Sequence, residues 1–318
     1  MILAIASGKG GTGKTTVAVN LALAVSMLKK EEGDAEVIFL DCDVEEPNAA
    51  LFLHPKIEQR QEVGLLVPEI DLSRCTYCGR CAQVCQFHAI AVVKPRILFF
   101  PELCHGCGSC ALNCPENAIH EKLRVNGVIE QGSAQDSIRF AHGILNIGEA
   151  MATPLIRQLK QLAIPPDPQR SLVILDAPPG TACPVVETMR GADVVLMVTE
   201  PTPFGLHDLR LTVQVAYNDL SLPVAVVINR DGIGDDGVDR YCQSEGIPIL
   251  MRIPLNRCIA EAYAEGCLVV DALPEYQGHF LELYRRLMAF GESYKKGGGC
   301  REKVKSRQEK EHKFAEGK

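Results

Sequence analysis

Short, uninterrupted apolar runs alternate with segments of helical periodicity along most of the chain. Apolar runs of this length are typical of strands that are buried on both faces of a parallel sheet. The sequence therefore predicts an α/β fold in which helices cover a mostly parallel sheet. The predicted strands are 2–6, 37–41, 172–176, 193–201, 224–230 and 247–254, with two more strands around a turn within 127–148. The predicted helices are 15–30, 153–162 and 277–290, with further helical segments near 205–219 and 235–245.

This alternation is interrupted between about Gly64 and Val125, where the chain is rich in cysteine and contains two similar units of about thirty residues. We expect a discontinuous domain of residues 1–63 and 127–294, with an inserted domain of residues 64–126. The remaining residues, 295–318, hold nine Lys or Arg and four Glu with almost no apolar side chains. Such a composition predicts a basic, disordered tail.

Composition narrows the class of protein. The 318 residues carry a net charge of −7, and the pI is about 5.7. An acidic chain of this kind has no nucleic-acid signature, and no apolar run reaches membrane-spanning length. We therefore expect neither a nucleic-acid partner nor a stable membrane anchor. Fourteen cysteines without a signal-peptide pattern indicate metal ligation in a reducing compartment, so we predict a cytoplasmic protein.

The stretch from Gly8 to Thr15, GKGGTGKT, fits the phosphate-binding pattern G-x-x-x-x-G-K-[ST], and it lies between a predicted strand and a predicted helix. Its backbone N–H groups would surround phosphate oxygens, Lys14 would reach the β- and γ-phosphates, and the Thr15 hydroxyl would bind Mg²⁺. Asp176 ends a strand where a Walker-B carboxylate is expected. The predicted ligands are therefore ATP and Mg²⁺. The predicted contact residues of the loop are Gly8, Lys9, Gly10, Gly11, Thr12, Gly13, Lys14, Thr15 and Thr16.

Lys9 directly after the first glycine, together with the DAPPGT sequence that begins at Asp176, makes the chain similar to one family. It resembles the deviant Walker A ATPases of the MinD, ParA and nitrogenase-iron-protein superfamily, and DAPPGT resembles Mrp-type iron–sulfur carriers in particular. The resemblance implies a homodimer in which Lys9 reaches the partner's nucleotide. It also implies that Asp43 positions the attacking water, that Asp41 supports Mg²⁺ and that Asn229 contacts adenine. Lys9, Lys14 and Asp43 are thus the predicted catalytic residues.

Simpler interpretations exist for some of these residues. Asp41 and Asp43 could only cap a loop, and asparagine is common in turns, so Asn229 alone is a weak signal. Glu200 and Pro201 could line the base pocket or simply end a strand.

The cysteine-rich segment repeats one spacing, C-x2-C-x2-C-x3-C. Three closely spaced thiolates hold one face of a [4Fe–4S] cubane, and the fourth cysteine of each run binds the other cluster. We therefore assign one cluster to Cys75, Cys78, Cys81 and Cys114, and a second cluster to Cys85, Cys104, Cys107 and Cys110. Zinc is the competing metal, but four-cysteine zinc sites use two separated C-x2-C pairs. The segment resembles a bacterial two-cluster ferredoxin, except that Gln86 stands where the first run usually has proline.

Six cysteines lie outside these runs. Cys183 follows Asp176 by seven positions, where the nitrogenase iron protein has a cluster ligand, but we expect a small buried thiol there. Cys42, Cys242, Cys258, Cys267 and Cys300 form no ligand spacing, and no C-terminal C-x2-C pair for a transferable cluster is present. His105, between Cys104 and Gly106, is expected to face solvent.

These parts together predict an ATPase that couples ATP hydrolysis to electron transfer through two [4Fe–4S] clusters to a partner protein. One alternative is an ATPase for iron–sulfur or metallocofactor assembly, whose partner would be a cofactor-assembly protein. Another is a MinD-like positioning switch with structural or redox-sensing clusters. Weak intrinsic hydrolysis is expected in each case, because no arginine finger is evident in the chain.

Overall fold

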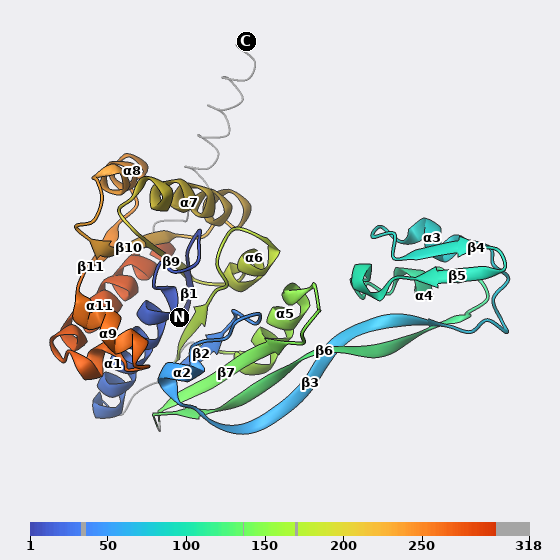
Figure 1. The fold of residues 1–318 in the computed structure, drawn as a ribbon, viewed down its shortest axis with the longest axis horizontal. Helices are drawn as coiled ribbons and strands as arrows, with labels where there is room; N and C mark the ends of the chain where they lie inside the picture. Colours follow the sequence, from blue (N-terminus) through green and yellow to red (C-terminus); the bar gives the residue numbers. More distant parts are fainter. Residues whose placement is uncertain (33–35, 136, 169–170, 297–318) are drawn as a thin grey trace, which may run out of the picture.

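The computed structural model describes residues 1–32, 36–135, 137–168 and 171–296. Its centre is a nine-stranded sheet with the order β11-β10-β9-β1-β8-β2-β7-β6-β3 (Figure 1). The strands from β11 to β7 are parallel, whereas β6 is antiparallel to both β7 and β3. The strand bounds are β1 Ile2–Ala6, β2 Val37–Asp41, β3 Lys56–Ile70, β6 Ile119–Ala134, β7 Ile138–Leu145, β8 Leu172–Asp176, β9 Val194–Thr199, β10 Val224–Asp231 and β11 Ile249–Pro254.

Helices cover both faces of the parallel part of this sheet, so each face forms its own apolar core. One face packs against α1 (Lys14–Glu32), α2 (Ala50–Leu53), α9 (Arg257–Ala264), α10 (Val269–Ala272) and α11 (Glu275–Lys296). The other packs against α5 (Ala152–Ala163), α6 (Cys183–Met189), α7 (Pro203–Gln214) and α8 (Gly237–Glu245), with a π-helical turn at Val215–Asp219. The predicted mostly parallel sheet with helices on both faces is confirmed. The continuous apolar runs arise because β1, β2, β8 and β9 are buried along their length.

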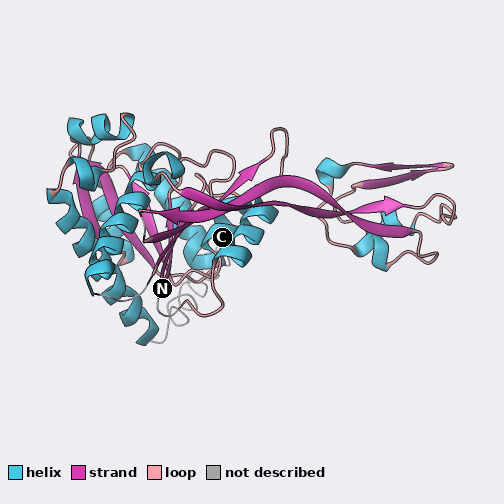
Figure 2. Cartoon of the chain, turned by 90° about the horizontal axis from the view of Figure 1, so that it is seen from below, coloured by secondary structure: helices cyan, strands magenta, loops and turns pink. Residues whose placement is uncertain are grey.

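The two longest strands, β3 and β6, leave the sheet together as a twisted ribbon. Figure 2 shows them running side by side from the sheet to the cysteine-rich insertion. β6 pairs with β7 only from Gly127 to Ala134, and beyond that point it pairs with β3 alone. The β3–β6 register shifts between Val63 and Gly64, at the place where the ribbon leaves the sheet. The first part of β3, residues 56–63, lies outside the strands predicted from the sequence.

The insertion at the end of the ribbon is built from the two sequence repeats. Each repeat places a left-handed glycine before a short helix: Gly79 precedes α3 (Arg80–Val84), and Gly108 precedes α4 (Ser109–Leu112). Between these helices lie β4 (Ile90–Val93), β5 (Arg96–Phe99) and a 3₁₀ turn at Pro101–Leu103. A small core of Cys81, Ile90 and Ile119 holds the insertion together. A core this small would be marginal alone.

The C-terminal end of the described chain differs slightly from the expectation. Lys295 and Lys296 belong to α11, and Lys295 pairs with Asp193 at 2.9 Å. The rest of the predicted tail, residues 297–318 with Cys300, lies outside the described residues. Among the helices that the structure describes, none combines the length and the apolar character needed to span a membrane.

Candidate functional site

The loop between β1 and α1 has the backbone of a phosphate-binding loop. Gly11 and Gly13 have φ values of +77° and +89°, a conformation that favours glycine. Close packing restricts two positions further. A Cβ atom at Gly8 would lie 2.5 Å from the backbone oxygen of Asp208, and one at Gly13 would lie 2.4 Å from Nδ2 of Asn229. The glycine pattern seen in the sequence is therefore required by the way the loop packs against neighbouring elements.

Three hydrogen bonds hold this loop in place. The Ser7 hydroxyl donates to the Lys9 carbonyl at 2.7 Å, and the Gly180 N–H donates to the Ser7 carbonyl at 3.0 Å. Asn229 donates from Nδ2 to the Thr12 carbonyl at 2.8 Å. The side chain of Asn229, which follows the buried part of β10, thus supports the phosphate loop directly. Its contact with adenine stays a prediction.

Two carboxylates meet at the ends of adjacent strands. Asp41 ends β2 and Asp176 ends β8, in direct register, and both are at most 1% exposed. Asp41 accepts N–H bonds from Asp43 at 3.1 Å and Ala49 at 3.0 Å. Neither carboxylate oxygen of Asp176 has a hydrogen-bond partner within the described ranges. A buried carboxylate without a partner is costly, and Mg²⁺ bound by oxygen ligands would satisfy it. Asp176 therefore fits a magnesium site.

Burial also raises the pKa values of these carboxyl groups. The pKa of Asp41 is raised well above its ordinary value by burial and by the nearby Asp176. Burial raises the pKa of Asp176, and the positive charge of the nearby Lys14 ammonium offsets part of this rise. The nearby Thr15 hydroxyl also lowers the Asp176 pKa. Burial raises the pKa of Asp43, in the loop after β2, to about 6, again against Lys14. The structure thus brings Lys14, Asp43, Asp41 and Asp176 together around one site.

The eight cysteines of the two runs line two separate hollows in the insertion. Cys75, Cys78, Cys81 and Cys114 line the distal hollow, together with Ile70 and Ile119 at the end of the ribbon. Cys85, Cys104, Cys107 and Cys110 line the proximal hollow, together with Leu66 and Pro68, which lie nearer the sheet. The structure therefore groups the cysteines in the two sets of four that the spacing predicts, with the last cysteine of each run crossing to the other set.

The backbone around both hollows is arranged alike. The N–H of Ala89 donates to Cys85 Sγ at 3.3 Å, and 29 positions later the N–H of Ala118 donates to Cys114 Sγ, also at 3.3 Å. Such contacts stabilise thiolates and tune the potential of a bound cluster. Burial raises the pKa of Cys110 to about 11, so its thiolate needs a nearby cation or cluster. Within the described residues, no three His, Cys, Asp or Glu side chains form a site for a single metal ion. The fit to a larger cluster rests on the four cysteines that surround each hollow.

The nucleotide-binding part of the chain matches a known family. The CbiA family, described as the CobQ/CobB/MinD/ParA nucleotide binding domain, matches residues 3–269. The chain belongs to this family. It is a P-loop ATPase of the MinD/ParA type, as the sequence predicted. In fold it is similar to the cell-division ATPase MinD of Pyrococcus furiosus, with a TM-score of 0.54 and 20% identity over 91% of this chain and 98% of that one.

Three relatives of this ATPase extend the comparison. An uncharacterised protein of Methanocaldococcus jannaschii is 32% identical over 84% of this chain and 90% of its own length. A Synechocystis protein named iron-sulfur cluster carrier protein is 50% identical over 86% of this chain and 65% of its own length. An uncharacterised ferredoxin of M. jannaschii is 37% identical over 17% of this chain and 75% of its own length.

The lysine that marks this type of ATPase forms an ion pair within its own chain. Lys9 Nζ lies 3.0 Å from Glu200 Oε2, and Arg230 Nη1 lies 2.5 Å from Glu200 Oε1. The Glu200 side chain is only 6% exposed. Glu200 therefore holds two cations beside the phosphate loop, a role that the sequence did not reveal. The reach of Lys9 across a dimer stays a prediction, and it requires this ion pair to open.

The cysteines outside the runs occupy varied environments. Cys183 was expected to be buried, and this is wrong: it is exposed because it begins α6 at the surface. Cys42 and Cys242 are buried in the core, and burial raises their thiol pKa values, that of Cys242 to about 12. Cys258 and Cys267 are exposed. His105 is exposed as expected, with its ring stacked on Phe87 at 3.7 Å between centroids.

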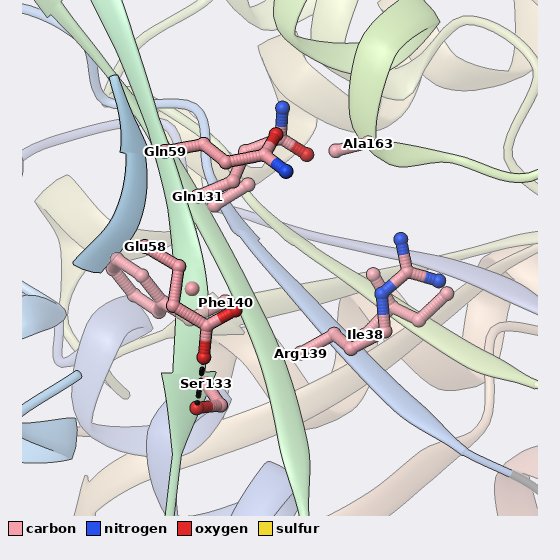
Figure 3. Close-up of a pocket in the computed structure, with 10 residues that line it drawn as sticks. Ile38, Glu58, Gln59, Gln131, Ser133, Arg139, Phe140 and Ala163 are labelled. Carbon is pink, nitrogen blue, oxygen red and sulfur yellow. Dashed lines mark hydrogen bonds between the residues drawn. The ribbon is translucent and has the colours of Figure 1, made fainter. Parts of the chain in front are cut away.

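A further cavity lies within the sheet, where β3 and β6 pair beside β7, and it includes neither the phosphate loop nor the cysteines (Figure 3). It measures about 340 Å³. Its wall combines polar side chains of β3, β6 and β7, among them Glu58, Gln131 and Arg139. The Ser133 hydroxyl donates to Glu58 at 3.0 Å across it. The lining includes Ile38, near the start of β2, whereas the carboxylate site lies at the end of that strand, so the two sites are separate.

Proposed function

We propose that this ATPase couples ATP binding and hydrolysis to electron transfer through two [4Fe–4S] clusters to a partner protein. The observation that carries the proposal is the partition of eight cysteines into two hollows in the insertion, which is carried by a ribbon whose first strand follows the segment that holds Asp43. When bound, the clusters would supply one-electron redox chemistry. The eight cysteines that line the two hollows would hold them.

The chain's own residues would couple the two sites through the segment after Asp41. This segment holds Asp43, continues through α2 and enters β3 at Lys56. The Val44 carbonyl accepts an N–H bond from Leu145 of β7 at 2.8 Å, so the segment is tied to the sheet beside the ribbon. In related nucleotide switches such segments rearrange with the γ-phosphate and its Mg²⁺. By linkage, a nucleotide that changes the cluster environment must also bind differently to reduced and oxidised protein.

Within this proposal the protein hydrolyses ATP as a homodimer. Lys14 holds the phosphates, Thr15 and Asp176 hold Mg²⁺, and Asp43 orients the attacking water. Lys9 leaves Glu200 and contacts the nucleotide of the second copy. Because each site then needs a residue from the other copy, hydrolysis would be slow in the monomer.

The test is the midpoint potential of the reconstituted clusters, measured anaerobically without nucleotide, with Mg-ADP and with a non-hydrolysable Mg-ATP analogue. We expect a shift of about 30 mV or more, about a threefold change in the equilibrium constant for one electron. Identical potentials in the three states would contradict thermodynamic coupling.

The name of the Synechocystis relative, iron-sulfur cluster carrier protein, favours a second candidate. In that case the chain would be an ATPase for iron–sulfur cluster assembly that passes a cluster to an acceptor protein. Transfer of labelled iron to an apo-ferredoxin, faster with ATP than without, would support this candidate. Retention of the clusters in the insertion throughout such an assay would favour electron transfer.

A further inference from the structure

Five ionisable side chains lie in direct register across five neighbouring strands. Asp41 of β2 is paired with Asp176 of β8 on one side and with His142 of β7 on the other. His142 is paired with Glu130 of β6, and Glu130 is paired with Arg60 of β3. We call this set the ionisable row: Asp176, Asp41, His142, Glu130 and Arg60. It begins at the predicted magnesium site and ends on the first strand of the ribbon.

The side chains of the row lie on one face of the sheet, because directly paired residues on neighbouring strands project to the same side. The preceding pair on this face confirms the arrangement, since Phe39 of β2 and Phe140 of β7 stack with their ring centroids 6.1 Å apart. Both rings belong to the core on the α1 face. The ionisable row therefore borders an apolar layer of the sheet.

The outer half of the row is closely connected. His142 Nε2 lies 2.8 Å from Glu130 Oε2, and Arg60 Nη1 lies 2.7 Å from Glu130 Oε1. The side chains of His142 and Glu130 are 8% and 13% exposed, whereas that of Arg60 is 66% exposed. The other ring nitrogen of His142, Nδ1, is buried and has no hydrogen-bond partner in the part of the chain described. One ring nitrogen of His142, Nε2, therefore contacts Glu130 of β6, whereas Nδ1 has no hydrogen-bond partner among the described residues.

Simple packing does not explain this arrangement. Burying polar and charged groups costs free energy unless they are paired, and apolar residues of similar size would often be as stable. The ribbon also carries an ordinary surface ion pair, Lys122–Glu69, in which both side chains are more than 60% exposed. The buried contact between His142 and Glu130 therefore has a cost that the surface pair does not have.

We propose that His142 and Glu130 are positioning residues that transmit the occupancy of the magnesium site to the base of the ribbon. The inference deepens the proposed function, on which it rests. Nucleotide with its cation changes the net charge around Asp41 and Asp176, and this field acts strongly in the dry interior. His142 is the register neighbour of Asp41 and the hydrogen-bonding neighbour of Glu130. A change in its position alters the β6–β3 pairing at Arg60, just before the register shift at Gly64.

The test is amide hydrogen exchange of the full chain with its clusters bound, measured without nucleotide and with a non-hydrolysable Mg-ATP analogue. We expect the analogue to change exchange of residues 56–65 and 124–134 in the wild type. Glu130→Gln should reduce this nucleotide-dependent difference at least twofold. The matched control is Glu69→Gln, which removes an acidic partner from the same ribbon outside the row, and it should keep the full difference.

Two further variants keep the inference testable if Glu130→Gln does not fold. His142→Gln removes the central contact, and Arg60→Gln removes the outer one from an exposed position that the fold tolerates. If the row acts as a unit, the effects of Glu130→Gln and His142→Gln will not add in the double variant. A full nucleotide response in the folded row variants, or no response in the wild type, would overturn the inference.

Exchange does not require electrons to move, so the two proposals can fail separately. If the row variants lose the exchange response while the wild-type potentials never shift with nucleotide, the electron-transfer function fails and this inference stands. If the potentials shift in the wild type and equally in Glu130→Gln, the function stands and this inference fails.

Discussion

Asp41 and Asp176 stand opposite each other at the ends of β2 and β8, and both carboxyl groups are buried. Two acidic groups so close together in the interior repel each other when both are ionised. The nucleotide-free site is therefore electrostatically unfavourable at neutral pH, and a bound cation relieves it. The same pair that prepares the magnesium site thus lowers the stability of the empty protein.

Asp176→Asn should stabilise the nucleotide-free protein. The pKa of Asp176 is higher in the folded chain than in the unfolded chain. Its contribution to stability is therefore complete below the ordinary aspartate value, near pH 4, and is lost as the pH rises through the raised value. Removing the unpaired charge should gain about 2 kcal/mol at pH 7.5, or about 4 °C in melting temperature. The melting temperatures of the wild type and of Asp176→Asn, measured in EDTA at pH 7.5 and pH 4.5, test this expectation.

The pH series is also the control. Because the pKa of Asp176 is raised in the folded chain, its carboxyl group is increasingly protonated as the pH falls, and the advantage of Asp176→Asn should shrink from pH 7.5 to pH 4.5. An equal or larger advantage at pH 4.5 would mean that relief of charge is not the cause. With Mg-ATP the order should reverse, since the variant lacks the carboxylate that holds the cation.

Asp43→Asn should slow hydrolysis without removing nucleotide binding. Asp43 lies beside Lys14 in the loop after β2, and its pKa of about 6 leaves it ionised at neutral pH. Loss of a group that orients or deprotonates the attacking water typically costs about 100-fold or more in rate. Steady-state hydrolysis and equilibrium binding of a fluorescent ATP analogue, measured on the same preparation, separate the two effects. Binding that weakens in step with the rate would place Asp43 in ligand binding instead.

Glu200→Gln should promote ATP-dependent dimerisation. In the single chain Lys9 is held 3.0 Å from the buried Glu200 carboxylate, so reaching a second copy requires that ion pair to break. Neutralising Glu200 removes this competition, and we expect dimers at a protein concentration about threefold to tenfold lower. Sedimentation with and without a Mg-ATP analogue gives the dimer constant.

Lys9→Ala is the counterpart of that variant, and it should abolish the ATP-dependent dimer in the presence or absence of Glu200. If Lys9→Ala dimerises as the wild type does, the role of Lys9 across the interface is refuted. Arg252→Gln provides a control, because it removes a surface cation that pairs with Asp231 at 3.3 Å and lies outside the phosphate loop.

Local sequence patterns predicted the parts of the molecule that depend on local chemistry. The phosphate loop could be predicted because its glycines, its lysine and its flanking strand and helix are contiguous. The grouping of Cys114 with Cys75 could be predicted because the spacing within each run limits which thiolates can share a hollow. Asp176 could be placed near the phosphate loop because it ends a predicted strand, whereas the expectation for Asp41 came from the family resemblance.

Other features depend on contacts between distant segments, which cannot be predicted from local patterns in a single sequence. The start of β3, residues 56–63, is mostly exposed and polar, so its pattern resembles a loop. The contact between Glu130 and Arg60 spans 70 positions and exists only because β3 and β6 pair in one register. The exposure of Cys183 follows from the placement of α6 at the surface, which local hydrophobicity did not reveal.

Replacing single cysteines should remove one cluster at a time. Cys114 lines the distal hollow with Cys75, Cys78 and Cys81, although it belongs to the second run. Cys114→Ser should therefore disturb the distal cluster, and Cys85→Ser should disturb the proximal one. Each variant should retain about half of the wild-type iron, near four atoms per chain. Iron analysis and electron paramagnetic resonance of the reduced protein measure the number and type of clusters left.

Cys183→Ser is the matched control, because Cys183 is exposed on α6 and lines neither hollow. It should keep the full iron content and an unchanged spectrum. The assignment of Cys114 to the same cluster as Cys78 can be tested further with Cys78→Ser. This variant and Cys114→Ser should lose the same spectral component. If Cys114→Ser instead resembles Cys107→Ser, each run holds its own cluster, and the crossed assignment is wrong.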